Sequence, residues 1–377
     1  MRIRYIAILF LFVLFSIEGF GQYKISNGKN DLLISGMITT FYNYNAPKPG
    51  IVDHRKNSFY LRDAQLELDG GNKKWDFAVK VDFADLFSAT DDPDSPGMME
   101  ANVTYKGWKF MDIVAGYQKL PFSRSVQVSF AYSPWFRRAE ICKGDYFSQR
   151  DIGVTFVKKM WKKKLNVYAG IYSGMGESSI KTPNDFSGNP EYIARAEFNW
   201  PGGGKYRNID PEHLKKPTFS VGVNGRYARK QSYSGGGYPI KTINGDKYVY
   251  GFDVNGMWQG LSATFEMHQI YMKPETQEFL YGLNTDYFRA GGWYGELSYH
   301  IKPINTVISG RYQEMNANDL VKGITKHVDA SCVYMMKGYD SMLKLNFNYN
   351  KQEEFLTEVS PLKWRWQLTL GWQYMFN

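Results

Sequence analysis

The 377-residue sequence contains few cysteines, few histidines and little continuous apolar sequence. Its two cysteines, Cys142 and Cys332, are too few for a disulfide framework, and its five histidines offer no pair with the spacing of a metal site. The one long apolar run covers residues 6–17, which is shorter than the roughly twenty residues that a membrane-spanning helix needs. We therefore expect no transmembrane helices, no metal and no other cofactor.

Aromatic residues and glycine are abundant instead. The chain is 17% aromatic, with 28 tyrosines and 36 glycines. Transmembrane β-barrels have such averages, because each strand is apolar on one face and polar on the other. The 46 basic residues exceed the 37 acidic ones by a modest margin and are scattered along the chain, so we expect no nucleic-acid partner.

The last residues, 363–377, alternate between an apolar and a polar face. Every second residue from Trp364 to Phe376 is apolar, with aromatic side chains towards both ends and leucines between them. Only a strand alternates in this way, and this order of side chains favours a strand that crosses a bilayer over one in a soluble sandwich. The stretch resembles the C-terminal signal read by the barrel assembly machinery, which usually ends on Phe, whereas here Asn377 follows Phe376.

The N-terminus has the organisation of an export signal. Two arginines stand among the first four residues, the apolar run 6–17 follows, and Gly19 and Gly21 supply small side chains. We predict a signal peptide over residues 1–21 with cleavage before Gln22. No cysteine follows the cleavage position, so a lipoprotein anchor is not expected.

The rest, residues 22–377, is predicted to be one all-β domain, a transmembrane antiparallel up-and-down β-barrel. A single-chain barrel of this kind closes with an even number of strands. Alternation and turn residues predict about sixteen strands, at residues 31–44, 58–68, 73–84, 98–106, 109–118, 149–158, 164–175, 191–200, 217–228, 247–258, 261–271, 286–301, 304–314, 324–335, 340–350 and 363–376.

Short and long connections alternate between these strands. A barrel whose N-terminus lies in the periplasm has short periplasmic turns and long extracellular loops in this order. The exception is 201–216, a long connection where a short turn is expected; it predicts a small plug, a subunit contact or a slip in the strand count.

A polar interior implies water in the barrel, and about sixteen strands make it wide enough for a channel. Alternation places at least as many acidic as basic side chains inside, so the wall is mixed, and selectivity depends on charge at the narrowest point. Alternation also points Cys332 at lipid, which favours two free thiols, or one buried thiol, over a disulfide. The inward basic residues are Lys80, Arg195, Arg226, Arg311, Lys344 and Arg365.

The longest predicted connection, residues 119–148, is expected to fold into the barrel. It combines bulky aromatic residues with the adjacent pair Arg137 and Arg138. Two guanidinium groups at a constriction would attract and hold oxyanions. The alternative is that they pair with nearby carboxylates, such as Glu140, and fix the loop.

Six motifs in order resemble the phosphate-selective porin O and P family of Gram-negative outer membranes. They lie within residues 58–204 and read FYLRDAQLELDG, AGYQKLPFS, RRAE, QRDIGV, AGIYSGMG and YIARAEFNWPGGG. The resemblance implies a sixteen-stranded, often trimeric barrel whose third extracellular loop carries arginines that contact the anion. Arg137 and Arg138 match that loop region, and Arg150 matches the strand that follows. One departure is Asp63, where the family commonly has a second basic residue after Arg62.

We therefore predict a diffusion porin embedded in outer-membrane lipid, passing small hydrophilic solutes or anions such as phosphate. The residues expected to set selectivity are Arg137, Arg138, Arg124, Lys80, Arg195, Arg226 and Arg311. The main alternative is a plugged barrel that binds solutes or serves a structural role without conducting. An outer-membrane lipid hydrolase is not favoured, because no Ser stands with a His and an acid in a recognisable arrangement.

Overall fold

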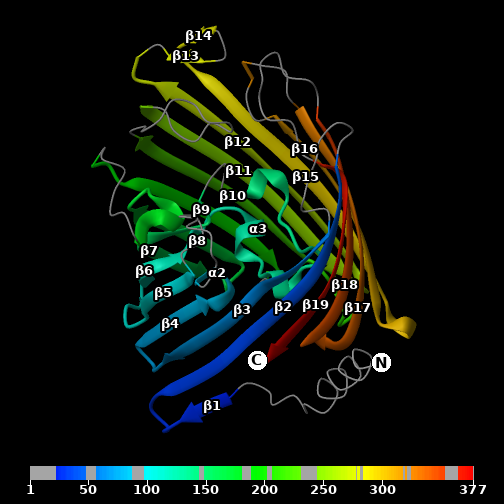
Figure 1. Ribbon diagram of the computed structural model, residues 1–377. Helices are drawn as coiled ribbons and strands as arrows, with labels where there is room; N and C mark the ends of the chain where they lie inside the picture. Colours follow the sequence, from blue (N-terminus) through cyan, green and yellow to red (C-terminus); the bar gives the residue numbers. More distant parts are fainter. Residues whose placement is uncertain are drawn as a thin grey trace.

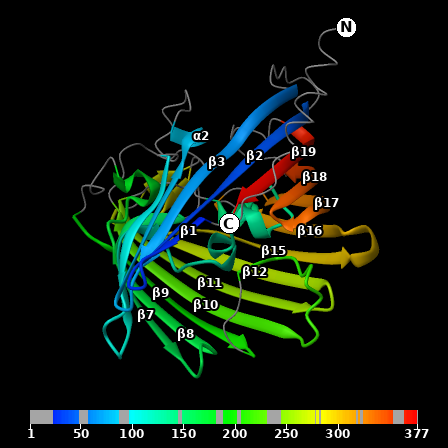
Figure 2. The same ribbon diagram turned by 90° about the horizontal axis from the view of Figure 1, so that it is seen from below.

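The computed structural model describes residues 23–47, 57–86, 97–143, 148–180, 188–201, 206–230, 244–276, 278–280, 283–316, 319–320, 324–352 and 364–376. The predicted signal peptide lies outside these residues, as do most of the predicted loops 45–57, 85–97, 229–246 and 351–362. Figures 1 and 2 show the strands as one curved wall with the short helix α3 inside it.

Sixteen strands pair antiparallel in chain order, and the last pairs with the first to close the barrel. All sixteen predicted strands are confirmed, with ends that differ by a few residues. They are β2 (Asp31–Pro47), β3 (Asn57–Gly71), β4 (Trp75–Asp82), β5 (Met98–Tyr105), β6 (Asp112–Lys119), β7 (Arg150–Met160), β8 (Leu165–Tyr172), β9 (Glu191–Trp200), β10 (Thr218–Lys230), β11 (Gly245–Trp258), β12 (Leu261–Pro274), β15 (Phe288–Ile301), β16 (Thr306–Asn316), β17 (Ile324–Tyr339), β18 (Ser341–Gln352) and β19 (Trp364–Phe376).

Three further strands lie outside this ring. β1 (Tyr23–Ser26) pairs with the start of β2, and β13 (Glu278–Leu280) and β14 (Leu283–Thr285) form a separate hairpin. The short helices are α2 (Phe83–Leu86), α3 (Arg124–Gln127), η1 (Phe130–Tyr132), η2 (Glu140–Cys142), η3 (Gly176–Ile180) and η4 (Lys302–Ile304). No helix among the described residues has the length and apolar character needed to cross a membrane.

Side chains alternate between an apolar outside and a polar inside, because successive residues of a strand point to opposite faces. In β18, Leu343 and Leu345 are each 40% exposed on the outside, whereas Lys344 between them is fully buried. The predicted faces are confirmed there. Cys332 is exposed and Cys142 buried, and both are free thiols, as predicted.

The wall is lower on one side. β4, β5 and β6 contain eight residues each, whereas β17 contains sixteen. At 3.4 Å per residue and a tilt near 45°, eight residues rise about 19 Å, less than the roughly 25 Å apolar band of an outer-membrane barrel.

Connections at one end are short, such as Gln259 and Gly260 between β11 and β12, and those at the other end are long. We call these ends the short-turn end and the long-loop end. The exception is again the connection from β9 to β10, of which the structure describes Pro201 and residues 206–217; residues 206–217 are here named the turn segment.

Candidate functional site

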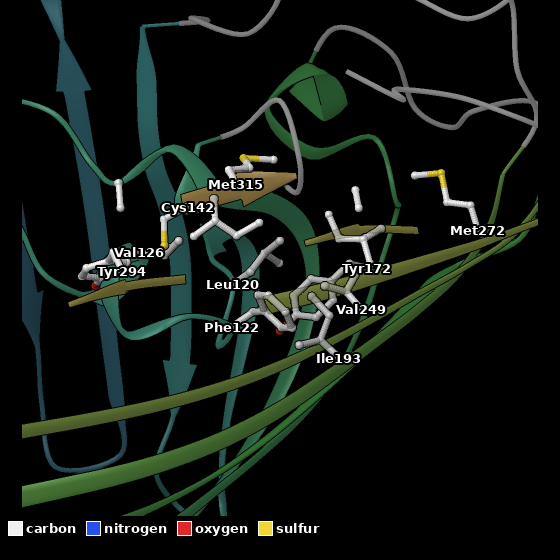
Figure 3. Packing of buried hydrophobic residues seen from close by; sticks show 14 of the residues in the cluster. Leu120, Phe122, Val126, Cys142, Tyr172, Ile193, Val249, Met272, Tyr294 and Met315 are labelled. Atoms are coloured by element: carbon white, nitrogen blue, oxygen red, sulfur yellow. The ribbon is translucent and has the colours of Figure 1, made fainter. Parts of the chain in front are cut away.

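The connection from β6 to β7 enters the barrel, and its residues 120–143 are here named the constriction loop. Its apolar side chains lie against the inner wall, where Leu120 and Phe122 are fully buried. Figure 3 shows them beside wall residues Tyr172, Ile193 and Val249. Burial of these side chains removes the loop from water on that side and holds it against the strands.

Polar wall residues complete the anchoring by bonding to the backbone of the constriction loop. A buried backbone N–H or C=O group needs a hydrogen-bond partner, and much of this loop has no regular secondary structure that would supply one. The Lys344 ammonium donates to the carbonyls of Phe130 and Ser133, at 3.0 and 2.8 Å. Three backbone amides donate to the wall: Ser125 to Glu266 (3.0 Å), Phe136 to Asn346 (2.8 Å) and Glu140 to Gln313 (2.7 Å).

The turn segment enters from the opposite end and meets the constriction loop. The backbone amide of Asn208 donates to the carbonyl of Tyr132 at 3.0 Å. Glu296 of β15 contacts both segments. One of its carboxylate oxygens accepts from the Trp135 indole (2.7 Å), and the other accepts from the side-chain amide of Asn208 (2.5 Å). The two segments therefore form one body against the inner wall.

Two cavities lie end to end between this body and the low wall. The long-loop chamber has a volume of about 490 Å³ and the short-turn chamber one of about 800 Å³. The same five residues line both chambers, and we take this junction as the narrow point of the route. These residues are Met37, Gln65, Lys80, Lys119 and Ser129.

Charge differs between the two chambers. Among the described residues, six basic and four acidic side chains line the long-loop chamber, whereas three basic and four acidic ones line the short-turn chamber. The basic residues of the long-loop chamber are Arg62, Lys80, Lys119, Arg138, Lys143 and Arg150.

Lys119 and Arg150 stand directly opposite each other in the pairing of β6 with β7. Both line the long-loop chamber. Lys119 forms an ion pair with Glu100, with 3.7 Å between the ammonium and the carboxylate. Like charges placed opposite each other repel and favour an anion between them.

Of the predicted loop arginines, Arg138 lines the long-loop chamber. Its guanidinium donates to the carbonyls of Ser125 and Val128 and to the Gln149 amide oxygen, which are neutral acceptors and leave its positive charge uncancelled. Burial lowers the pKa of Arg138 to about 10, so the group stays charged at neutral pH. Arg137 is half-buried, and its carbonyl accepts from Arg311 at 3.1 Å.

Arg124 is 2% exposed and faces neither chamber. It donates to the Ser220 hydroxyl and to the carbonyl of Arg207, each at 3.1 Å. It therefore connects the constriction loop to the wall and to the turn segment.

The predicted wall arginines lie in buried ion pairs. Lys80 lines both chambers and is also ion-paired, with Glu67 at 3.1 Å. Arg195 lies 2.5 Å from Asp253, Arg311 lies 2.7 Å from Asp329, and Arg226 pairs with Glu191. The side chain of Arg365 is outside the described part of the chain.

Arg62, Lys119 and Arg150 were not among the predicted site residues. Strict alternation turns each of them towards lipid, but β3 is irregular at Arg62 and β6 at Gly116, three residues before Lys119, and Arg150 is the first residue of β7. Pairing of β2 with β3 shifts register between Thr39 and Thr40, which leaves Arg62 as the extra residue of a β-bulge. Its guanidinium consequently lies over the Phe130 ring of the constriction loop, 3.9 Å from the centroid.

One buried cluster contains residue types that bind metals. The ligand atoms of Cys142, Glu266 and His268 all lie within 4.8 Å of one another. The Glu266 carboxylate already accepts from the Ser125 amide and the Tyr294 hydroxyl, and it lies 2.8 Å from the His268 ring. We interpret this cluster as an anchor of the constriction loop.

A closed barrel with an apolar outside, a polar inside and a narrowed aqueous route defines an outer-membrane channel of the porin class. Residues 34–376 match the family model of phosphate-selective porin O and P, so the chain belongs to that family. It is an outer-membrane diffusion porin that passes small hydrophilic solutes. No curated protein sequence matches the chain.

Solved outer-membrane proteins share the fold at low sequence identity. OmpT of Vibrio cholerae in its trimer form is 11% identical with a TM-score of 0.60, covering 92% of this chain and 100% of its own. The anion-selective porin from Comamonas acidovorans is 10% identical with a TM-score of 0.60 over the same shares. The channel DcaP of Acinetobacter baumannii is 13% identical with a TM-score of 0.58, covering 95% of this chain and 100% of its own.

Proposed function

We propose that the pore prefers small anions, with phosphate as one candidate, and that this preference arises in the long-loop chamber. The observation that carries the proposal is the facing pair Lys119 and Arg150, beside Arg62, Lys80 and Arg138. The acids of this chamber are engaged by protein donors; for example, Asp82 accepts from two backbone amides and Gln65. Lys80 and Lys119 are ion-paired with Glu67 and Glu100, so the positive charge that attracts an entering anion comes mainly from Arg138, whose acceptors are neutral, and from Arg150.

Transport in this proposal is passive. Fixed positive charges raise the local concentration of anions and briefly hold them, while the separation between the constriction loop and the low wall limits solute size. Arg138 and Lys80 act on the solute directly. Arg124, Arg195, Arg226 and Arg311 position the constriction loop and the wall, because each is buried in hydrogen bonds or ion pairs. Arg137 contributes charge beside Arg138.

The test is the reversal potential of the double variant Lys119→Gln, Arg150→Gln in a KCl gradient across a planar bilayer. We expect the reversal potential of this variant to shift towards the potassium equilibrium potential. The matched control is Lys326→Gln, Lys273→Gln, which removes two charges from residues that line neither chamber. An unchanged potential in the double variant, with single channels of normal size, would remove this pair from the selectivity determinants.

We also propose that the barrel assembles as a homotrimer through its low wall, β4 to β6. A wall of about 19 Å leaves part of a roughly 25 Å apolar bilayer uncovered, which a second copy would shield. Trp75 and Val103 are 49% and 45% exposed on this face. Val103→Trp should reduce the trimer fraction in native electrophoresis, whereas Leu297→Trp on the tall wall should not; a monomeric wild type contradicts the proposal.

Export and assembly follow the predicted route in this proposal. Signal peptidase removes residues 1–21, and the barrel assembly machinery binds the C-terminal strand β19 (Trp364–Phe376). The intact mass of the membrane-embedded protein tests the first step, since the mature chain should begin at Gln22. A mass that includes the first 21 residues would contradict it.

We propose no catalytic activity for this chain. His268, His300 and His327 are 1%, 3% and 4% exposed and lie on the inner face of the wall. Purified protein should release no product from a lipid ester. Planar-bilayer current separates a porin from the plugged alternative in one measurement.

A further inference from the structure

Two neighbouring turns at the short-turn end are rich in lysine and aromatic residues. The chain reads KKMWKKK over residues 158–164, where β7 turns into β8, and KGWKF over residues 106–110, between β5 and β6. Turns elsewhere at this end differ. Gln259 and Gly260, between β11 and β12, are uncharged, and Lys337 at the end of β17 pairs with Asp340 at 3.8 Å. A dense group of basic residues therefore lies under β5 to β8.

Two of these lysines lie on the outside of the wall, each over an aromatic ring. The Lys158 ammonium is 4.1 Å from the centroid of the Phe110 ring and also donates to the Phe110 carbonyl. The Lys164 ammonium is 4.0 Å from the ring of Trp200. Phe110 and Trp200 are 65% and 46% exposed. Aromatic rings at a membrane boundary, with ammonium groups beside them, place positive charge at the level of lipid headgroups.

The turn from β7 to β8 has a backbone conformation that its residues disfavour. Trp161, Lys162 and Lys163 have φ angles of +50°, +56° and +66°, a region that favours glycine. Hydrogen bonds fix this turn, since the Lys164 amide donates to the Trp161 carbonyl at 3.2 Å and the Asn199 amide to the Lys164 carbonyl at 2.6 Å. Trp161 is left 68% exposed. Strained backbone of this kind is retained at functional sites, where it presents particular side chains.

The lysines of these turns keep most of their charge. Lys106 and Lys159 pair with Asp76 and Asp112, at 2.7 and 3.3 Å. Within the part of the chain that the structure describes, the others form no ion pair. Together with the rings beside them they are here named the basic turn cluster, which consists of Lys109, Phe110, Lys158, Trp161, Lys162, Lys163, Lys164 and Trp200.

The height of the wall brings lipid headgroups close to this cluster. β6 and β8, the neighbours of β7, contain eight residues each and rise about 19 Å, less than the roughly 25 Å apolar band of an outer-membrane barrel. A bilayer thins beside a short apolar wall, and lysines at its edge extend towards the headgroups. The short turns of such a barrel face the periplasm, so these are headgroups of the periplasmic leaflet.

We propose that the basic turn cluster binds an anionic phospholipid of the periplasmic leaflet. The lysines contact the phosphodiester oxygens, and Trp161 and Trp200 pack against the glycerol and the upper acyl chains. A lipid fits better than a soluble polyanion, because the cations stand beside rings that face the membrane. No residue of the cluster lines either chamber, so this site is separate from the pore and does not depend on its anion preference.

The experiment measures the lipid that the folded protein retains. Immobilised protein is equilibrated with detergent micelles that contain equal amounts of phosphatidylglycerol and phosphatidylcholine, and the extracted lipid is quantified by mass spectrometry. We expect the wild type to prefer phosphatidylglycerol. Lys162→Gln, Lys163→Gln should lower this preference by about 25-fold, because each lysine near an anionic headgroup contributes about fivefold to affinity.

A second variant separates binding from folding. Lys162→Asn, Lys163→Gly places residues in the turn that accept a left-handed conformation, so its urea midpoint should be at least that of the wild type, while the lipid preference is lost. An unchanged preference in this folded variant would overturn the proposal.

The matched control is Lys302→Gln, Lys337→Gln, which removes two exposed lysines from other turns at the same end and should leave the preference unchanged. Equal losses in the control and in the cluster variants would overturn the proposal, as would a wild type that retains the two lipids equally. Excess inorganic phosphate should not displace the lipid, since its chains remain against the wall. Displacement by phosphate would assign the site to the free ion and overturn the lipid assignment.

Discussion

Arg124 of the constriction loop donates a hydrogen bond to the backbone carbonyl of Arg207 in the turn segment, at 3.1 Å. Two segments that enter the barrel from opposite ends are joined by this contact. Because Glu296 also bonds to both of them, the position of the constriction depends on the turn segment as well as on the wall.

Replacing Arg124 by Ala should therefore loosen both segments. The Ser220 hydroxyl and the Arg207 carbonyl lose a charged donor, and we expect the free energy of unfolding to fall by about 1–3 kcal/mol. Urea unfolding in lipid vesicles measures this change. Arg229→Ala, at an exposed ion pair, should cost less than about 1 kcal/mol; equal losses in the two variants would contradict the joining role.

A charge at Ile209 should release the turn segment. Ile209→Asp places a carboxylate among Val307, Val333, Met335 and Met342, and we expect a local destabilisation of about 2–5 kcal/mol. Proteinase K should then cleave near residues 206–217 faster than in the wild type. Lys215→Asp changes charge at an exposed site of the same segment and should not increase cleavage. Protection of the Ile209 variant would show that the apolar contact does not hold the segment.

Gly116 is required where β6 approaches the narrow point. Its φ of +123° suits glycine, and an added Cβ would lie 2.4 Å from the Ala101 carbonyl oxygen. Gly116→Ala should destabilise the barrel by about 1–3 kcal/mol and displace Lys119. Gly310→Ala is the matched control, since nothing lies within 4 Å of its Cβ position. Equal urea midpoints for the two variants would refute the requirement.

Glu140 should stabilise the constriction loop down to low pH. Burial alone would raise the pKa of this carboxyl, but Lys143, His327 and Arg137 outweigh it and lower the pKa to about 2 from 4.5. A depressed pKa contributes stability that is complete above about pH 4.5 and is lost as the pH falls towards 2. Glu140→Gln should therefore unfold at a lower temperature than the wild type at pH 7, and the difference should vanish near pH 2. A difference that persists unchanged at pH 2 would contradict this assignment.

The strands were predictable from the sequence because alternation is local. Leu343, Lys344 and Leu345 show their faces without any tertiary information, and the sixteen strands follow from such runs. The chamber residues were harder, because Arg62 reaches the lumen through a β-bulge and Lys119 follows the left-handed Gly116. Neither irregularity can be seen in a single sequence.

The turn segment left a signal that alternation alone could have exposed. Val307, Val333, Met335 and Met342 are apolar at positions that face the lumen, and they are adjacent across β16 to β18. Apolar residues that face inwards predict a cover. The long connection 201–216 was the unexplained turn at the same end of the barrel, but its partner contacts depend on the three-dimensional fold.

The most direct test of the central claim is the single-channel current of the purified wild-type protein in a planar bilayer under a KCl gradient. The account predicts discrete current steps, because a water-filled route runs between the constriction loop and the low wall. It also predicts a reversal potential with the sign of the chloride equilibrium potential, because positive charge in the long-loop chamber is not fully compensated. A reversal potential with the sign of the potassium equilibrium potential would contradict the account. So would the absence of current across a bilayer into which folded protein has been inserted.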